Sequence, residues 1–280
     1  MAETVVPGPV CDLSAVREAT CIHTKKIYDS CQAKDCIEDL RLYPTQSSQA
    51  VIDQATNVKA GRACLLYVLV SVEPMGFNRG FYTVDLRYYY KVTCDAFTGC
   101  SRPVQITGLA VFDKRSILFG SEGAAKVFTS NIPCAELQND LVLDNNKPQA
   151  VVEAVDPIIL SLKLCNVCER PMCGEHTLTE VPAGIQAAFD EPIVLDGSGC
   201  QRRVYLSLGQ FSILRLERDS QLLIPVYDYC MPDKECSYEH CDDDPCEIFQ
   251  QVNFPVGQFF PPSAASDIDP LSELRKSCCQ

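Results

Sequence analysis

Basic residues are scarce in this sequence. Its 280 residues include 24 lysines and arginines against 37 aspartates and glutamates, which gives a formal net charge of −13. Nucleic-acid binding depends on clustered lysine and arginine that neutralise phosphates, so this balance argues against a nucleic-acid partner. Long apolar runs are missing as well. None approaches the roughly 18 residues of a membrane-spanning helix, so we expect no membrane insertion.

Signatures of the common enzyme classes are also missing. The sequence holds no phosphate-binding P-loop, no dinucleotide fingerprint and no HExxH motif. Gly120–Gly123 fails as a nucleophile elbow, because Phe119 stands where the first glycine should be. The three histidines are His23, His176 and His240. A nucleophilic cysteine–histidine pair remains an alternative hypothesis, since such partners meet in space rather than in sequence. We expect no enzyme, with a redox or hydrolytic activity as the alternative.

The middle of the chain predicts a β-sheet. Leu65–Val72 is a nearly unbroken apolar run, typical of a strand covered on both faces. Pro74–Gly80 supplies proline and glycine for a reversal, which predicts a hairpin with the next run. That next run alternates strictly between two faces. Its inward set is Leu86, Tyr88, Tyr90 and Val92.

Elsewhere the chain predicts mostly short strands and turns. The expected strand regions are Gln49–Ala60, Val151–Leu164, Arg203–Leu208, Ser212–Glu217 and Gln221–Tyr229. Ser30–Leu42 predicts a turn or two of helix that ends before Pro44, and Pro182–Asp190 predicts a short helix. Arg218–Ser220 predicts a turn.

Strands of this kind, with little helix, predict a mainly β fold. We expect an antiparallel β-sandwich with cysteine-rich loops and extended N- and C-terminal arms. Its parts are an N-terminal arm at residues 1–45, a sandwich core at 46–260 and a tail at 261–280. The core carries a cysteine-rich insert at 165–200. Two separate domains are the alternative to this single one.

Eighteen cysteines are present. A secreted protein would use them as a disulfide framework, and a cytosolic one would keep them reduced or bind metal with them. Four fall within residues 61–164, and the others lie in predicted loops and ends. A β domain of this size buries enough surface without staples, so we interpret them as cross-links between molecules. The alternative is that most thiols are free, buried or incidental. The cross-linking candidates are Cys11, Cys21, Cys31, Cys36, Cys230, Cys236, Cys241, Cys246, Cys278 and Cys279.

The last two of these are the clearest case. Cys278 and Cys279 are adjacent, and adjacent cysteines rarely bridge each other without strain. Near a chain end they are expected to be exposed and able to capture a partner thiol. An accidental pair of no consequence is the alternative.

Metal binding is the competing interpretation of the cysteines. Three thiolates and one imidazole fall within twelve residues, a ligand set that suits tetrahedral zinc. These residues are Cys165, Cys168, Cys173 and His176. A second cluster, Cys230–Cys246, contains Asp242–Asp244, which is either a solvated acidic loop or a loose calcium ligand set. A redox dithiol at Cys165 and Cys168 is the third possibility.

Several long stretches resemble a known group of proteins. They are CIHTKKIYDSCQAKDCIEDLRLY, GFNRGFYTVDLRYYYKVTCDAFTG, GLAVFDKRSILFGSEG, YLSLGQFSILRLERDSQLLIPVYDYCMPDKEC and CDDDPCEIF. They resemble cysteine-rich proteins of clostridial spore formers over residues 20–262. The nearest characterised relatives are cysteine-rich spore coat and exosporium proteins that self-assemble into cross-linked layers. In that family the insert after Val151–Leu164 tends to be richer in cysteine than here.

The resemblance implies a structural subunit without catalytic residues or cofactors. Its expected partners are copies of itself, in a lattice or filament, and other cysteine-rich spore proteins. The first residues hold no basic segment followed by an apolar one, so we expect no secretory signal. We expect the protein to be made in the mother-cell cytoplasm, deposited on the spore surface and oxidised after the cell lyses. This route would reconcile the lack of a secretory signal with the many cysteines. The alternative is a zinc-stabilised soluble binding module that uses the Cys165–His176 cluster.

Overall fold

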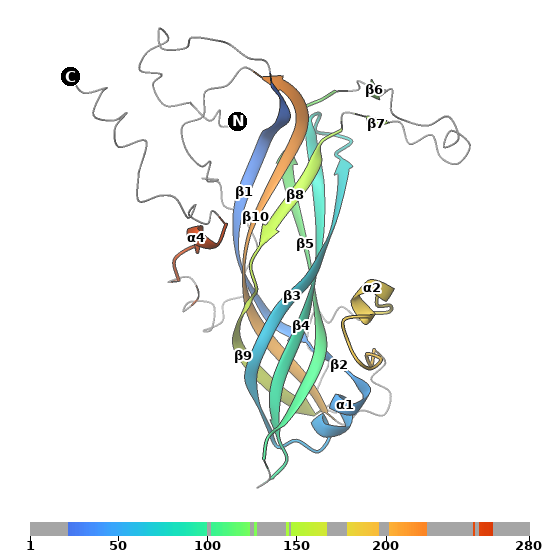
Figure 1. Ribbon diagram of the computed structural model, residues 1–280, viewed down its shortest axis with the longest axis vertical. Helices are drawn as coiled ribbons and strands as arrows, with labels where there is room; N and C mark the ends of the chain where they lie inside the picture. The colour runs from blue at the N-terminus through green and yellow to red at the C-terminus, as the bar shows by residue number, and fades with distance from the viewer. Residues whose placement is uncertain are drawn as a thin grey trace, which may run out of the picture.

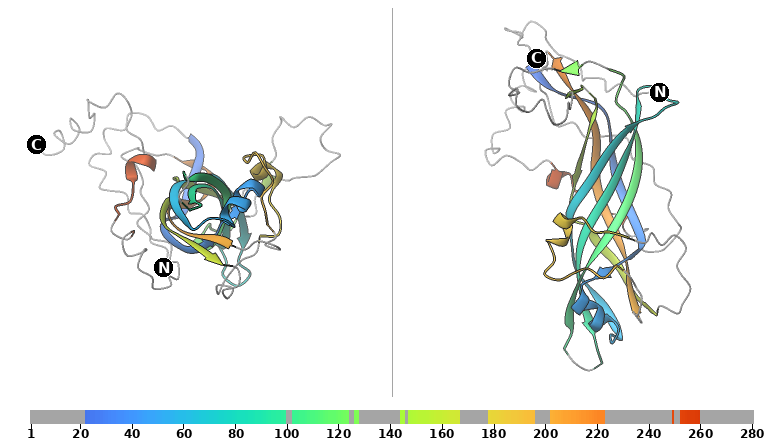
Figure 2. Two further views of the ribbon diagram at one scale, coloured as in Figure 1. Left: turned by 90° about the horizontal axis from the view of Figure 1, so that it is seen from below. Right: turned by 90° about the vertical axis from the view of Figure 1, so that its right-hand side faces the viewer.

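The computed structural model describes residues 22–99, 102–123, 126–127, 144–145, 147–166, 178–195, 202–222, 249 and 252–259. Most of these residues lie in two antiparallel sheets that pack face to face, which confirms the predicted mainly β sandwich. The body is elongated, and its long strands twist along its length around a common interior (Figures 1 and 2).

One sheet, here sheet B, contains the predicted hairpin. Its strands are β2 (Tyr43–Pro44), β3 (Asn57–Pro74), β4 (Phe81–Phe97) and β5 (Val104–Phe119), in the order β2-β5-β4-β3. β3 and β4 pair from Asn57–Phe97 to Pro74–Tyr82, which confirms the hairpin. Alternating valine, tyrosine and threonine favour this pleated, half-buried surface. The predicted inward set of β4 is buried.

The other sheet, sheet A, is organised by one central strand. Its strands are β1 (Ile22–Arg41), β8 (Gln149–Ala154), β9 (Ile158–Asn166) and β10 (Arg202–Leu222). β1 pairs along one edge of β10, while β8 and β9 pair one after the other along its opposite edge. Pro157 lies at the break between β8 and β9. Proline has no N–H to donate to the ladder, so the partner strand is interrupted there.

Short elements join and flank the sheets. They are α1 (Gln46–Ile52), α2 (Ala183–Gln186), α4 (Val256–Phe259), β6 (Lys126–Val127) and β7 (Asp144–Asn145). α2 confirms the helix predicted at Pro182–Asp190. Together with the segment around it, α2 covers part of the outer face of sheet B, where Ile185 and Phe189 pack on Tyr43, Tyr89 and Leu109.

The main core lies between the two sheets. Sheet B contributes Tyr88, Tyr90 and Leu118, and sheet A contributes Leu206 and Leu216 to the same apolar cluster. All five side chains are almost fully buried. The removal of this apolar surface from water is the main stabilising contribution to the fold.

The N-terminal part of the described chain differs from the prediction. Residues 22–41, expected to lie in an arm with a short helix at Ser30–Leu42, form β1 instead. The helix prediction is wrong because β1 pairs with β10, nearly 200 residues away, and that pairing outweighs local preference. Conversely, the strand predicted at Gln49–Ala60 begins as helix α1 and enters β3 only at Asn57.

Three further boundaries are corrected by the structure. Val151–Leu164 is two strands rather than one region, split at Pro157. Arg203–Leu208 and Ser212–Glu217 belong to the single strand β10, which also runs through the turn predicted at Arg218–Ser220. The β10 segment stays extended there because β1 pairs with it as far as Leu222. The strand predicted at Gln221–Tyr229 lies mostly outside the described residues.

Candidate assembly surfaces and cysteine sites

Two of the predicted cross-linking cysteines are buried in the subunit. Cys31 and Cys36 are on β1, both are buried, and both are already disulfide-bonded within the chain. A buried, oxidised sulfur is not accessible to a thiol of another molecule. The structure therefore places these two among the internal bonds of the subunit, contrary to the role expected for them.

Three other cysteines carry free thiols. Cys64 on β3 and Cys165 on β9 are half-buried, while Cys94 on β4 is buried. Burial raises the pKa of Cys94 from about 9 to about 11, and the charge of Asp95 adds to this, although a hydrogen bond with the Gly61 backbone works against it. A thiol with such a pKa stays protonated at neutral pH and is a poor nucleophile. Cys94 is therefore a structural cysteine.

The remaining candidate residues lie outside the described residues. For the cross-linking hypothesis these are Cys11, Cys21, Cys230, Cys236, Cys241, Cys246, Cys278 and Cys279. For the zinc hypothesis they are Cys168, Cys173 and His176, so the structure places only Cys165, near the end of β9. Within the described ranges no three metal-ligating side chains gather into one group.

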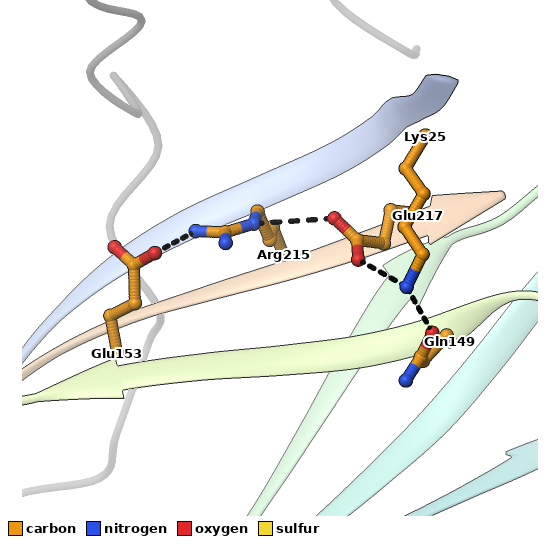
Figure 3. Close-up of polar contacts among 5 residues, drawn as sticks. All are labelled: Lys25, Gln149, Glu153, Arg215 and Glu217. Atoms are coloured by element: carbon orange, nitrogen blue, oxygen red, sulfur yellow. Dashed lines mark hydrogen bonds and ion pairs between the residues drawn. The ribbon is translucent and has the colours of Figure 1, made fainter. Parts of the chain in front are cut away.

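The outer face of sheet A carries a charged network across three strands (Figure 3). Lys25 Nζ of β1 lies 3.2 Å from Glu217 Oε1 of β10 and donates a hydrogen bond to Gln149 Oε1 of β8. Arg215 Nε, also on β10, lies 3.4 Å from the other oxygen of Glu217, and its Nη1 pairs with Glu153 of β8. Each positive side chain thus has a negative neighbour. The network links the three strands, and its positive and negative charges offset one another.

The outer face of sheet B is charged in one part and apolar in another. Arg87 on β4 makes a two-pronged pair with Asp113 on β5, and Arg115 on β5 makes the same kind of pair with Asp85 on β4. These hydrogen bonds raise the pKa of both arginines, so the guanidinium groups stay charged. Beside these pairs, Leu69 of β3 is opposite Arg87 in register and half exposed.

β3 is the outermost strand of sheet B and the most exposed of the long strands. Tyr67 and Leu69 are 56% and 50% exposed, and Phe77 at the tip of the β3–β4 hairpin is fully exposed. The prediction that Leu65–Val72 is covered on both faces is therefore wrong. β3 pairs only with β4 in the described ladders, so no strand is hydrogen-bonded along its other edge. Strands β8 and β9 lie near that edge, and Asp156 between them accepts the Leu65 N–H through Oδ1.

A buried charged pair was not predicted from the sequence. Lys114 on β5 and Asp35 on β1 meet between the sheets, with both side chains 1% exposed. The alternation on β5 contained a signal for it, because Lys114 shares the inward register of Ala110, Phe112 and Leu118. A lysine at an inward position requires an acid from the facing sheet, and only the folded structure identifies that acid.

Comparison with known proteins finds similarity to a spore protein. The chain is similar to Exosporium protein A of Clostridium sporogenes (strain ATCC 15579), with 22% identity over 276 residues. The aligned part covers 94% of this chain and 78% of that protein. No protein family matches the sequence, and no solved structure matches it. This similarity supports one part of the predicted resemblance, namely that the chain is related to an exosporium protein. No helix among the described residues is long and apolar enough to cross a membrane.

Proposed function

We propose that this chain is a structural subunit of a spore-surface layer or filament, locked to its neighbours by intermolecular disulfides. The observation that carries this is the similarity to Exosporium protein A along nearly the whole chain. A structural role needs a stable body and exposed attachment points rather than a catalytic site, so we infer that the chain is not an enzyme.

The described fold fits such a subunit. Its five long strands, β1, β3, β4, β5 and β10, are 16 to 21 residues long. Typical strands have about five or six residues. At about 3.3 Å per residue, β10 alone spans about 70 Å. An elongated body of this kind can bridge neighbours in a layer, and the exposed apolar side chains on β3 are suited to contact with another subunit.

The cross-linking role falls on a smaller set of cysteines than the sequence indicates. Cys31 and Cys36 drop out because both are buried and already bonded. The proposed set is Cys11, Cys21, Cys230, Cys236, Cys241, Cys246, Cys278 and Cys279. Partner subunits are copies of this chain or other cysteine-rich spore proteins. We also propose synthesis in the mother-cell cytoplasm without a signal peptide, followed by deposition on the spore surface.

The test is an assembly assay on the full recombinant chain. Oxidised protein should run as a ladder of high-mass species on a non-reducing gel and form layers or filaments in electron micrographs, and reductant should collapse both. Replacing Cys278 and Cys279 by serine should shorten the ladder. Cys64→Ser is the matched control, since it removes a half-buried thiol of the sandwich and should leave the ladder unchanged. Monomer under oxidising and reducing conditions alike would exclude the cross-linking role.

A further inference from the structure

Lys114 and Asp35 connect the two sheets through the middle of the core. Lys114 Nζ lies 2.7 Å from each carboxylate oxygen of Asp35. Lys114 belongs to β5 of sheet B and Asp35 to β1 of sheet A, and the two residues are 79 positions apart in the chain. Both side chains are sealed from solvent. This is a fixed contact between a primary amine and a carboxyl group.

The surroundings disfavour charges. Leu86 is opposite Lys114 in the β4–β5 ladder, and Tyr88 and Tyr90 are buried in the same interior. Tyr88 donates a hydrogen bond to Ser212, whereas the Tyr90 hydroxyl has no hydrogen-bond partner among the described residues. Burial raises the pKa of Tyr90 well above its usual value, and the charge of Asp35 adds to this. Two ions held in such a site lose several kcal/mol of hydration each, which their mutual attraction only partly offsets.

The ion pair has a neutral alternative. Transfer of one proton from the ammonium to the carboxylate, along an existing hydrogen bond, gives an amine beside a carboxylic acid. An amine nitrogen equidistant from both oxygens at 2.7 Å is about 3 Å from the carboxyl carbon and near the plane of the carboxyl group, and a shift of the nitrogen to the face of that group would bring it into line for attack. The folded chain thus positions a nucleophile against an electrophile in a dry interior.

We propose that Lys114 and Asp35 join in an isopeptide bond between Nζ and the side-chain carbonyl carbon. The neutral amine attacks this carbon and forms the new C–N bond. The C–O bond to the hydroxyl then breaks, and the hydroxyl takes a second amine proton and leaves as water. Atoms and charge balance within the pair, with no oxidant or other reactant. The product is an amide that carries no net charge into the core.

Proximity and desolvation both favour this step. Well-oriented intramolecular reactions reach effective concentrations of about 10⁵ M or more. Conversion of two buried ions into a neutral amide removes their desolvation penalty. The released water returns to solvent, which opposes reversal. The bond would hold β1 to β5 under conditions that reduce every disulfide, so it would be independent of the cross-links proposed above.

The experiment is intact-mass spectrometry of the full chain after complete reduction and denaturation. The expected mass is that of the sequence minus one water molecule. Proteolytic mapping should then recover a branched peptide that joins the segments containing Lys114 and Asp35. Lys114→Arg and Asp35→Ala should each restore the full sequence mass, because arginine cannot lose its proton and alanine has no carboxyl group.

The matched control is a second lysine–aspartate pair that remains in contact with water. Lys163 Nζ lies 2.9 Å from Asp39 Oδ1, with Lys163 49% exposed. Lys163→Arg should keep the loss of water. A wild-type mass equal to that of the sequence overturns the isopeptide bond, whether or not the variants fold. A dehydrated mass that maps to a linear peptide, as an aspartate succinimide would give, overturns it equally.

Discussion

β10 and β3 are both long strands, but their environments are opposite. β10 is the central strand of sheet A and is buried along most of its length, although it contains serine, glutamine, arginine and glutamate. β3 contains the most continuous apolar run of the chain, yet it lies at the edge of sheet B and is largely exposed. A strand's place in the sheet order, rather than its own composition, therefore decides how much of it is buried.

The contrast also separates two roles. Some buried polar side chains of β10 have partners, as Ser212 has in Tyr88 between the sheets and Glu217 has in Lys25 on the outer face. Tyr67 and Leu69 of β3 are exposed on the outer face of sheet B, whereas Val68 and Val70 of the same strand pack against the core. An apolar edge strand is a surface that other chains can contact. β10 thus contributes mainly to stability, and β3 is the strand that we propose for contact with other subunits.

The largest effect should come from matched leucine truncations on the two strands. Leu216→Ala on β10 empties a fully buried site and should lower the free energy of unfolding by about 2–5 kcal/mol. Leu69→Ala on β3 removes a half-exposed side chain and should cost less than about 1 kcal/mol. Chemical denaturation of both variants measures the difference. Equal losses would show that β3 is covered in solution and would remove the contrast.

A pH-dependent effect of intermediate size should come from Cys94. Its folded pKa of about 11 lies above its ordinary value of about 9, so its contribution to stability is complete below pH 9 and is lost as the pH rises to 11. Two pKa units correspond to about 2–3 kcal/mol. Cys94→Ala should remove this part of the decline measured by denaturation at each pH.

The control for that experiment is a truncation without a titrating group. Val92→Ala, also on β4 and fully buried, should lower stability by a similar amount at every pH and keep the wild-type slope. Thiol labelling at neutral pH adds a check, since half-buried Cys64 on β3 should react before buried Cys94. A slope unchanged by Cys94→Ala would contradict the proposed burial of this thiol.

The smallest effect is expected from glycine-to-alanine substitutions that compare a closely packed position of β3 with an open one. A Cβ atom at Gly61 would clash with the Thr93 carbonyl oxygen of β4, so Gly61→Ala should cost about 1–2 kcal/mol in unfolding experiments. Gly76 at the hairpin tip has open space around it, and Gly76→Ala should be nearly neutral. If both variants are neutral, the two strands separate more readily near Gly61 than the structure indicates.

Local pattern was sufficient to predict part of the fold. The β3–β4 hairpin, the inward face of β4 and helix α2 follow from local pattern and turn residues, which are properties of neighbouring residues. β1 was missed because its inward positions include Asp35, which breaks the apolar alternation. Lys114, brought from β5 by the fold, makes an acid acceptable there. Burial of β10 and exposure of β3 were likewise set by strand order, which no local pattern contains.

The cysteine sites and the buried charged pair were also predictable only where local pattern was sufficient. The number of cysteines was evident from the sequence, but the burial of Cys31 and Cys36 depends on β1 being part of sheet A. Treating residues 1–45 as an arm made both appear available to other molecules. The inward lysine of β5 was visible as a break in the pattern, and its partner was not, because 79 residues separate them.

The extended pairing of β1 with β10 has a mechanical consequence. Their ladder runs from Ile22–Leu222 to Arg41–Tyr205, almost the full length of both strands. A force applied along these strands loads the hydrogen bonds of the ladder in shear, so many must fail together before the strands slide. A force that peels the strands apart would break them one at a time. The subunit should therefore be stiffest along its long axis.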